Sequence, residues 1–332
     1  MLNTNTKNLI KAINNKVIET QQYIHAKTSI EFLQNFEGVR SIGMMLLGET
    51  GLGKSTVLNK FESNNTERLA TNSKCLVDYD FTALPILKFD MPEQPTLKNM
   101  CKAILEAASH PNITGTGSTL TNRVDNLIKH RQVQYLIIDE CQHLLKEHGG
   151  NRTTEALNFI KNRMNEHKII VIVAGIPTAE DAITKYPELS ERLSYKKCYI
   201  RKFDIRTKES MTNFGSFLLS FQAIFAEHNT DICQLYETTM VHKLYLACAG
   251  SPRLFKYLLT NVIEAHAESK GTITENTFHK AYQQSQLNRY IGAFNPFSAS
   301  IEKVKERISE WLTFEQNNAD ENKKINKTKR KP

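Results

Sequence analysis

The sequence lacks long apolar runs and closely spaced cysteines. In a chain of 332 residues, no apolar stretch approaches the length of roughly 18 residues that a membrane helix needs. We therefore expect no contact with a membrane. The polar amino-terminal segment has no apolar core of the kind a secretion signal carries. No two of the six cysteines lie within ten residues of each other, which argues against a disulfide framework or a zinc ribbon. We therefore expect a cytoplasmic protein.

The excess of positive over negative charge is also small outside the carboxyl-terminal segment. Lys and Arg number 43 against 35 Asp and Glu, a formal net charge of +8. Residues 318–332 hold six basic residues and two acids, so they account for half of this excess. Such a segment is typical of a disordered tail, which could either aid solubility or bind DNA or an acidic partner. Any nucleic-acid surface elsewhere must come from local patches.

Periodicity divides the chain into helical and α/β regions. Apolar residues at helical spacing predict helices before Gly38, and short apolar runs alternating with amphipathic stretches then predict βα units on a parallel sheet. After residue 207 only helical patterns remain. The clearest expected strands are Ile42–Leu47, Ile86–Phe89, Tyr135–Ile138 and Ile169–Ala174. The expected later helices are Glu209–Glu227, Thr238–Ala249, Arg253–Ser269, Glu275–Ser285 and Ile301–Trp311. We expect a helical segment (1–37), an α/β core (38–206), a helical bundle (207–290), and a helix with a disordered basic tail (291–332).

A phosphate-binding pattern follows the first expected strand. Residues 48–55 read GETGLGKS, which fits G-x-x-x-x-G-K-[ST], with a strand before and a helix after. Glycines allow backbone N–H groups to approach phosphate oxygens, and the helix directs its positive end at them. Lys54 suits the β and γ phosphates of ATP, and the Ser55 hydroxyl suits Mg²⁺. The expected nucleotide-binding residues are Gly48, Glu49, Thr50, Gly51, Leu52, Gly53, Lys54, Ser55 and Thr56.

Two adjacent acids end the apolar run YLII. Asp139 suits a role in holding Mg²⁺ through its water shell, and Glu140 could polarise the water that attacks the γ-phosphate. Together with residues 48–55, this pair predicts an ATPase of the Walker A and Walker B type. Arg192 and Arg253 are candidate guanidinium contacts to phosphate, the first from a neighbouring subunit and the second from the helical bundle. Surface salt bridges are the other interpretation of both arginines.

Taken together, these features resemble an AAA+ ATPase: an α/β P-loop core followed by a helical lid with Gly-x-x-Arg at 250–253. Residues 85–95 (PILKFDMPEQP), 139–145 (DECQHLL) and 174–178 (AGIPT) further resemble the TniB/TnsC family of transposition ATPases. The likeness covers about residues 25–285. It implies an ATP- and Mg²⁺-dependent regulator that forms a homo-oligomeric ring or filament, such as a hexamer or heptamer, on duplex DNA. It also implies partners, namely transposase subunits and a TniQ-type target-selection adaptor. Hydrolysis would promote disassembly, in simple heteromeric or CRISPR-associated transposons.

One position departs from the family pattern. Ile176 stands where the family tends to show threonine at the end of the sensor strand, and Thr178 is the nearest polar substitute. If Thr178 does not replace it, we expect slow intrinsic hydrolysis.

DNA contacts are expected on core loops. Helix starts rich in Ser and Thr offer donors to phosphates, and nearby cations add charge. The candidates are Thr96, Lys98, Lys102, Ser118, Thr119, Arg123 and Lys146. Plain helix capping and a solvated face are the alternative interpretations.

Three other functions share some of these features. A helicase loader or initiator has the same motifs, but no winged-helix pattern follows the lid here. A P-loop phosphotransferase would turn over nucleotide without DNA, and a non-catalytic switch would bind ATP but no DNA.

Overall fold

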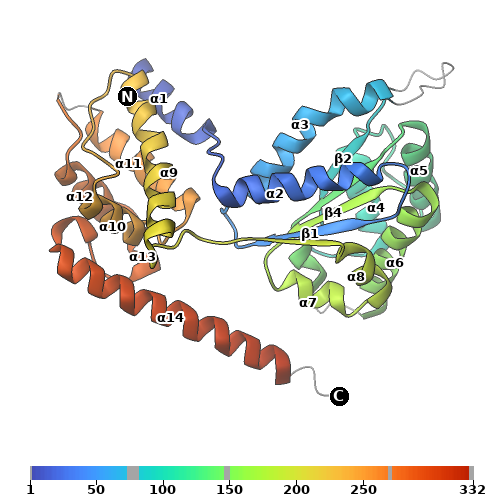
Figure 1. The fold of residues 1–332 in the computed structure, drawn as a ribbon. Coiled ribbons are helices and arrows are strands. Elements are labelled where there is room, and N and C mark those ends of the chain that lie inside the picture. The colour runs from blue at the N-terminus through green and yellow to red at the C-terminus, as the bar shows by residue number, and fades with distance from the viewer. Residues whose placement is uncertain (1, 73–81, 146–149, 268–270, 329–332) are drawn as a thin grey trace. The chain divides into compact units, whose positions relative to one another are not determined.

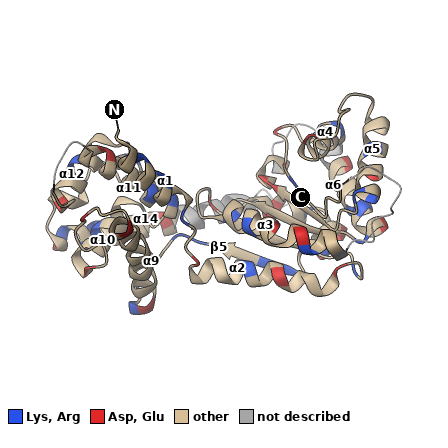
Figure 2. Ribbon diagram, turned by 90° about the horizontal axis from the view of Figure 1, so that it is seen from above, with Lys and Arg blue, Asp and Glu red and all other residues tan. Residues whose placement is uncertain are grey.

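The computed structural model describes residues 2–72, 82–145, 150–267 and 271–328 (Figure 1). The chain forms two compact units, Gln21–Arg201 and a second made of Met1–Thr20 with Lys202–Pro332. The expected amino-terminal segment 1–37 is thus divided between the units, and each unit is described by itself below. Figure 2 shows Lys and Arg interspersed with Asp and Glu along the helices of both units, in line with the small net charge of the body.

The first unit contains a five-stranded parallel sheet. Its strands are β1 (Gly43–Gly48), β2 (Ile86–Asp90), β3 (Tyr135–Asp139), β4 (Ile170–Gly175) and β5 (Lys196–Ile200), in the order β2-β3-β4-β1-β5. The four strands expected from the sequence are confirmed with small shifts at their ends. The fifth was missed because β5 is an edge strand in which only Cys198 and Ile200 are buried, so it has no continuous apolar run.

Helices cover both faces of this sheet because its inner strands are apolar on both sides. In β1, Met44 and Leu46 pack into one hydrophobic cluster, while Met45 and Leu47 pack into the other. The first face is covered by α2 (Gln21–Phe32), the short 3-10 helix η1 (Leu33–Phe36) and α3 (Lys54–Asn72). The second is covered by α4 (Leu97–Ala107), α5 (Gly117–His130), η2 (Cys141–Leu145), α6 (Gly150–His167), α7 (Ala179–Thr184) and α8 (Pro187–Leu193).

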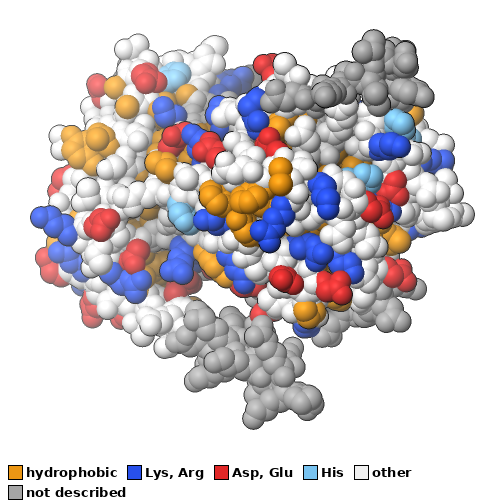
Figure 3. Space-filling view, turned by 45° about the vertical axis from the view of Figure 1, so that its right-hand side comes forward, with side chains coloured by type: hydrophobic (Ala, Val, Ile, Leu, Met, Phe, Trp, Pro, Cys, Tyr) orange, Lys and Arg blue, Asp and Glu red, His pale blue; other side chains and the backbone are white. Residues whose placement is uncertain are grey.

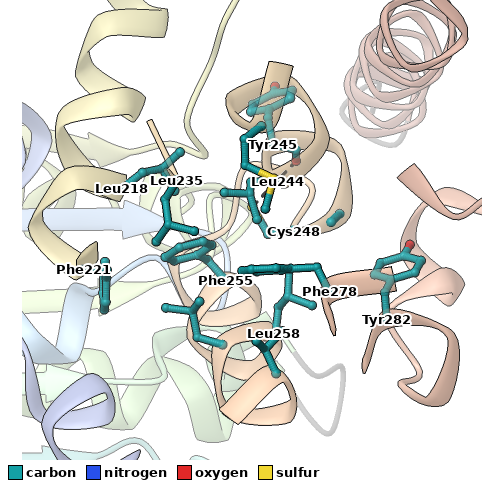
Figure 4. Close-up of a cluster of buried hydrophobic side chains, with 14 of the residues drawn as sticks. Leu218, Phe221, Leu235, Leu244, Tyr245, Cys248, Phe255, Leu258, Phe278 and Tyr282 are labelled. Atoms are coloured by element: carbon teal, nitrogen blue, oxygen red, sulfur yellow. Dashed lines mark hydrogen bonds between the residues drawn. The ribbon is translucent and has the colours of Figure 1, made fainter. Parts of the chain in front are cut away.

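The second unit is helical in its described residues, apart from one isolated bridge between Ile232 and Ile273. It comprises α1 (Thr4–Asn15), α9 (Lys208–Glu227), α10 (Thr238–Ala247), α11 (Pro252–His266), α12 (Glu275–Gln284), α13 (Asn288–Ile291), η3 (Pro296–Ser298) and α14 (Ile301–Thr328). Aromatic rings hold its core together: the Phe221 and Phe255 centroids lie 5.2 Å apart, between α9 and α11 (Figure 4). Leu9 and Ile13 of α1 are buried in the same cluster, which explains why the first helix belongs to this unit.

The carboxyl end differs from the expectation of a short helix and a disordered tail. Helix α14 continues from Ile301 to Thr328, well past Trp311. Between Trp311 and Thr328 the sequence has no Gly or Pro to end a helix, and it has several Glu, Gln and Lys residues, which favour a helix. Much of the basic segment therefore has helical backbone, while residues 329–332 lie outside the described part.

Candidate nucleotide-binding site

The loop between β1 and α3 has a backbone that its glycines make possible. Gly51 and Gly53 have φ values of +84° and +99°, which side-chain-bearing residues rarely adopt. A Cβ on Gly48 would lie 2.4 Å from the Ile200 carbonyl oxygen, so only glycine permits this approach of β1 to β5. The loop ends at Lys54, the first residue of α3, and the backbone N–H groups of that helix start are a ready anion site.

The Lys54 side chain is folded into this loop and is buried. Its Nζ donates hydrogen bonds to the carbonyl oxygens of Gly48 (2.7 Å) and Glu49 (3.0 Å). Burial lowers the pKa of Lys54, and the nearby Asp139 and Glu140 carboxylates oppose that shift. Leu52 is buried in the core beneath the loop, whereas Glu49, Thr50 and Thr56 are exposed. Of the expected Walker A residues, Leu52 and Lys54 are therefore buried and anchor the loop, whereas Glu49, Thr50 and Thr56 form its exposed polar surface.

The carboxyl end of β3 brings a carboxylate to this loop. Asp139 is 3% exposed and accepts hydrogen bonds from Ser55 Oγ (2.8 Å, to Oδ2) and from the Glu140 backbone N–H (2.9 Å, to Oδ1). A hydroxyl and a carboxylate are hard oxygen ligands of the kind Mg²⁺ prefers. The two residues fit the metal expected there, and they are joined across 84 positions of sequence.

A lysine that the sequence reading did not assign to the site also lies beside Asp139. Lys88 is on β2, and its Nζ is 4.0 Å from Asp139 Oδ2 while donating to Asn59 Oδ1 of α3 (2.5 Å). Its signal in the sequence is a lysine inside the otherwise apolar run Ile86–Phe89. Lys88 thus adds a positive charge next to the Asp139 carboxylate.

Glu140 is held by a glutamine two residues further on. Glu140 has a φ of +58°, uncommon for a residue with a side chain. Gln142 Nε2 donates to Glu140 Oε2, and Gln142 Oε1 accepts from the Ile176 backbone N–H at 3.3 Å. A Cβ on Gly175 would lie 3.0 Å from Gln142 Oε1, so glycine leaves room for this amide. Gln142 thus connects the Walker B glutamate to the end of β4, a link that sequence alone did not reveal.

The expected sensor substitute is not part of this link. Thr178 is exposed and precedes α7 without capping it through its side chain. Its contact with phosphate stays a prediction. At the end of β4 it is the Ile176 backbone, not a side-chain hydroxyl, that meets the polar groups of the site.

Arg192 lies at the opposite end of the sheet. On α8, its Nε donates to Asn165 Oδ1 (3.2 Å) and its Nη1 to the Glu188 carbonyl oxygen (2.6 Å). It lines a cavity of about 370 Å³ together with residues 39–42, which precede β1. Because the six residues of β1 span roughly 20 Å, Arg192 is remote from the Walker A loop at the other end of that strand. Arg192 therefore lies about one strand length from the Walker A loop of its own chain.

Arg253 belongs to the helical unit. It is exposed in the first turn of α11, after the Gly250-Ser251-Pro252 sequence that begins this helix. Gly250 has a φ of +67°, and a Cβ there would lie 2.6 Å from the Phe203 carbonyl oxygen. The local fold thus explains the glycine, whereas a phosphate contact by Arg253 stays a prediction.

Six of the seven expected DNA-contact residues lie on, or directly before, two helices that run side by side. Cys101 Sγ is 4.0 Å from Thr121 Oγ1, and Arg131 Nη1 donates to the Ala108 carbonyl oxygen at 3.0 Å. Helices α4 and α5 therefore point the same way, and their starts lie at the same end. The candidates at these starts are Thr96, Lys98 and Lys102 near α4, and Ser118, Thr119 and Arg123 on α5.

Local contacts occupy some of these groups. Thr96 Oγ1 caps α4 by accepting from the Asn99 backbone N–H (3.1 Å), whereas Lys98 is exposed. Arg123 Nη1 donates to the Thr114 carbonyl oxygen and to Asn112 Oδ1 (3.1 Å), so this guanidinium holds the loop before α5. Lys146 lies outside the described residues.

Comparison with known proteins decides the family. The model of the family described as bacterial TniB protein matches residues 9–202, more than half of the chain. The chain belongs to the TniB family. The match spans the Walker motifs, Gln142 and Arg192, and so covers both ends of the sheet described above. This is a family of transposition-associated AAA+ ATPases.

Solved structures agree on the fold of this TniB protein. The ORC2 protein of Aeropyrum pernix, in its ADPNP-ADP complexes, is similar with a TM-score of 0.57 and 14% identity, over 82% of this chain and 71% of that one. Cdc6p of Pyrobaculum aerophilum gives 0.58 and 11%, over 80% and 68%. The A. pernix ORC1 protein in complex with DNA gives 0.57 and 15%, over 81% and 65%. At these identities the likeness establishes the fold: an AAA+ α/β P-loop core with a helical carboxyl-terminal region.

Two negative results accompany these matches. A search of curated protein sequences finds no match to this chain. Within the described ranges, no helix is both long enough and apolar enough to cross a membrane.

Proposed function

We propose that this TniB protein is an ATP-dependent, DNA-binding transposition regulator that hydrolyses ATP only when copies assemble. The observation that carries the proposal is the arrangement of the sheet. Walker A, Asp139 and Glu140 meet at the carboxyl ends of the strands, while Arg192 lies at the opposite ends. One copy therefore supplies the arginine that another copy's site lacks.

The chain's own residues divide the chemistry between binding and activation. Backbone N–H groups of the loop and Lys54 would hold the phosphates of ATP, and Ser55 with Asp139 would hold Mg²⁺, which supplies charge neutralisation when bound. Glu140 would orient and polarise the attacking water, and Gln142 would keep the Glu140 carboxylate in place. Arg192 of a neighbouring copy would stabilise the charge that develops on the γ-phosphate.

The DNA-binding part rests on the starts of α4 and α5. These two helix starts lie together and carry hydroxyls, backbone donors and the exposed Lys98, a set suited to phosphate oxygens. Such contacts do not read base sequence, so we expect duplex binding of low sequence preference by a ring or filament. Transposase subunits and a TniQ-type adaptor are the proposed protein partners, in the bacterial cytoplasm.

A helicase loader or replication initiator is the second candidate. The fold likeness to ORC and Cdc6 proteins favours it, because those proteins share the core and the helical region. The family match over residues 9–202 favours transposition instead. Stable binding to a replicative helicase or preference for single-stranded DNA would favour the second candidate.

The deciding experiment is duplex-DNA binding by fluorescence anisotropy at fixed salt, with ATP, a slowly hydrolysed ATP analogue, ADP or no nucleotide. We expect tight binding only with ATP or the analogue, rising steeply with protein concentration as copies assemble. Glu140→Gln should bind DNA tightly with ATP and release it slowly, because ATP is retained but water activation fails. Equal or absent binding in all four nucleotide states would contradict the proposal.

A further inference from the structure

The cavity around Arg192 carries more positive charge than a single arginine provides. Arg40 comes from the segment before β1, Lys168 from the turn between α6 and β4, and Arg192 from α8. Glu191 is the one acid among the lining residues, so the lining carries a net charge of about +2 at neutral pH. Three separate elements thus direct cations to the amino ends of the strands.

Two of these cations have no acidic partner within the described part of the chain. Arg40 and Lys168 are exposed and take part in no salt bridge there, while Arg40 lies with its guanidinium carbon 5.8 Å from the Tyr195 ring centroid. Lys168 has a φ of +54°, an uncommon conformation for a side-chain-bearing residue, just where the chain enters β4. A cavity of about 370 Å³ with unpaired cations at its wall suits a phosphate-bearing group.

The rim of this cavity is apolar and aromatic. Phe32 and Tyr195 are 38% and 37% exposed and stack with centroids 6.2 Å apart, and the Phe36 ring lies 5.2 Å from Tyr195. Val39, beside Arg40, is 74% exposed. The space-filling view of this side shows hydrophobic side chains gathered next to Lys and Arg (Figure 3). Exposed aromatic groups bordered by cations are typical of protein interfaces, whereas the backbone of duplex DNA offers no apolar surface to match.

We propose that Arg40 and Lys168 act with Arg192 as one cationic pocket that receives the ATP phosphates held by a second copy of this chain. This inference rests on the proposed function, and it extends the trans contact from one arginine to three elements. The aromatic rim formed by Phe32, Phe36 and Tyr195 packs on the neighbouring copy and excludes water around the phosphates, which strengthens the ionic contacts. Arg40 and Lys168 stabilise negative charge on the oxygens, while Arg192 is fixed by its hydrogen bonds to Asn165 and Glu188.

The test compares Arg40→Ala/Lys168→Ala with the wild-type chain. Both residues are exposed, so the double variant should keep the wild-type melting temperature. It should also keep the wild-type affinity for ATP at protein concentrations too low for assembly. Its steady-state ATP turnover should fall on the order of 10- to 100-fold at concentrations where the wild type assembles. Lys185→Ala, which removes an exposed lysine outside the cavity, is the matched control and should keep wild-type turnover.

A mixing experiment separates action in trans from a general loss of activity. Glu140→Gln keeps the cationic pocket but cannot activate water, and the double variant keeps Glu140 but lacks two cations. Combined in equal amounts, they should regain activity, because roughly a quarter of the junctions in a head-to-tail assembly join an intact site to an intact pocket. Mixtures that stay as inactive as the separate variants would overturn the inference.

Further arms identify the source of the phosphate. If the pocket binds the DNA backbone instead, the double variant will show weaker duplex binding and a smaller salt slope, with ATP turnover unchanged in the absence of DNA. That result would overturn the inference while leaving ATP-dependent assembly intact. Absence of turnover in the wild-type chain at every concentration would instead contradict the proposed function itself.

Discussion

The two ends of the parallel sheet hold their charged side chains in opposite ways. At the carboxyl ends, Lys54, Asp139 and Glu140 each have hydrogen-bond partners within their own unit. At the amino ends, Arg40 and Lys168 have no salt bridge among the described residues, and Glu191 is the one acid that lines the cavity with them and Arg192. The comparison teaches that cations and carboxylates stand together at the carboxyl ends, the balanced end, whereas three cations and one acid line the cavity at the amino ends, where the proposed anion is the phosphate of a second copy.

The largest effect should follow from Lys54→Ala at the balanced end. The substitution removes the buried cation that would contact the β and γ phosphates, together with its hydrogen bonds to the Gly48 and Glu49 carbonyl oxygens. We expect loss of measurable ATP binding in a titration with a fluorescent ATP analogue. Lys60→Ala, which removes an exposed lysine from the same helix, should bind normally. Retained affinity in Lys54→Ala would show that the loop alone binds the nucleotide.

Arg192→Ala is the corresponding test at the other end. Because Arg192 is roughly a strand length away from the chain's own site, nucleotide affinity of the dilute chain should not change. Turnover in the assembled state should fall on the order of 10³-fold if the guanidinium stabilises the transition state of a neighbouring site. The measurement is steady-state hydrolysis over a range of protein concentrations. Normal turnover would remove Arg192 from the mechanism and erase the contrast between the two ends.

A smaller effect should follow from Gln142→Ala, which loosens the balanced end without removing a charge. Glu140 would lose the amide that holds it, so turnover should fall about 10-fold while ATP affinity and KM stay near wild-type values. Gln142→Glu should be worse, because it places a second carboxylate beside Glu140. Equal changes in affinity and turnover would indicate that Gln142 only supports the fold of η2.

Much of this site could be predicted from sequence because its residues are local in the chain. The loop from Gly48 to Ser55 and the acids at the end of β3 follow apolar runs that predict strands. Parallel strands bring their carboxyl ends together at one edge of the sheet. The joining of Ser55 to Asp139 follows from this topology. The sheet itself was predicted except for β5, where alternating burial left no apolar run.

The remaining features depend on side-chain directions that spacing does not encode. Gln142 reads as part of a polar turn until its amide is seen between Glu140 and Ile176. Arg40 and Lys168 are 128 positions apart, and nothing in their neighbourhoods distinguishes them from other surface cations until both line one cavity with Arg192. The sequence does not predict the helical continuation of α14 to Thr328, because a charge-biased segment is typical of disorder, although this one contains no Gly or Pro before Thr328.

The smallest expected effect concerns DNA, and it asks whether the helix starts near the balanced end make contacts beyond the chain. Lys98→Ala with Arg123→Ala should weaken binding to different duplex sequences alike and lower the salt slope by about one per lost phosphate contact. Lys98 is exposed and should act through charge alone, whereas Arg123 also holds the loop at Thr114. Removing Arg123 should therefore weaken DNA affinity by more than the loss of one phosphate contact would. Anisotropy at several salt concentrations with the slowly hydrolysed analogue measures both quantities. Lys129→Ala, at the far end of α5, is the control and should leave the slope unchanged. If the Lys98 and Arg123 variants also leave it unchanged, duplex DNA does not contact this end of α4 and α5.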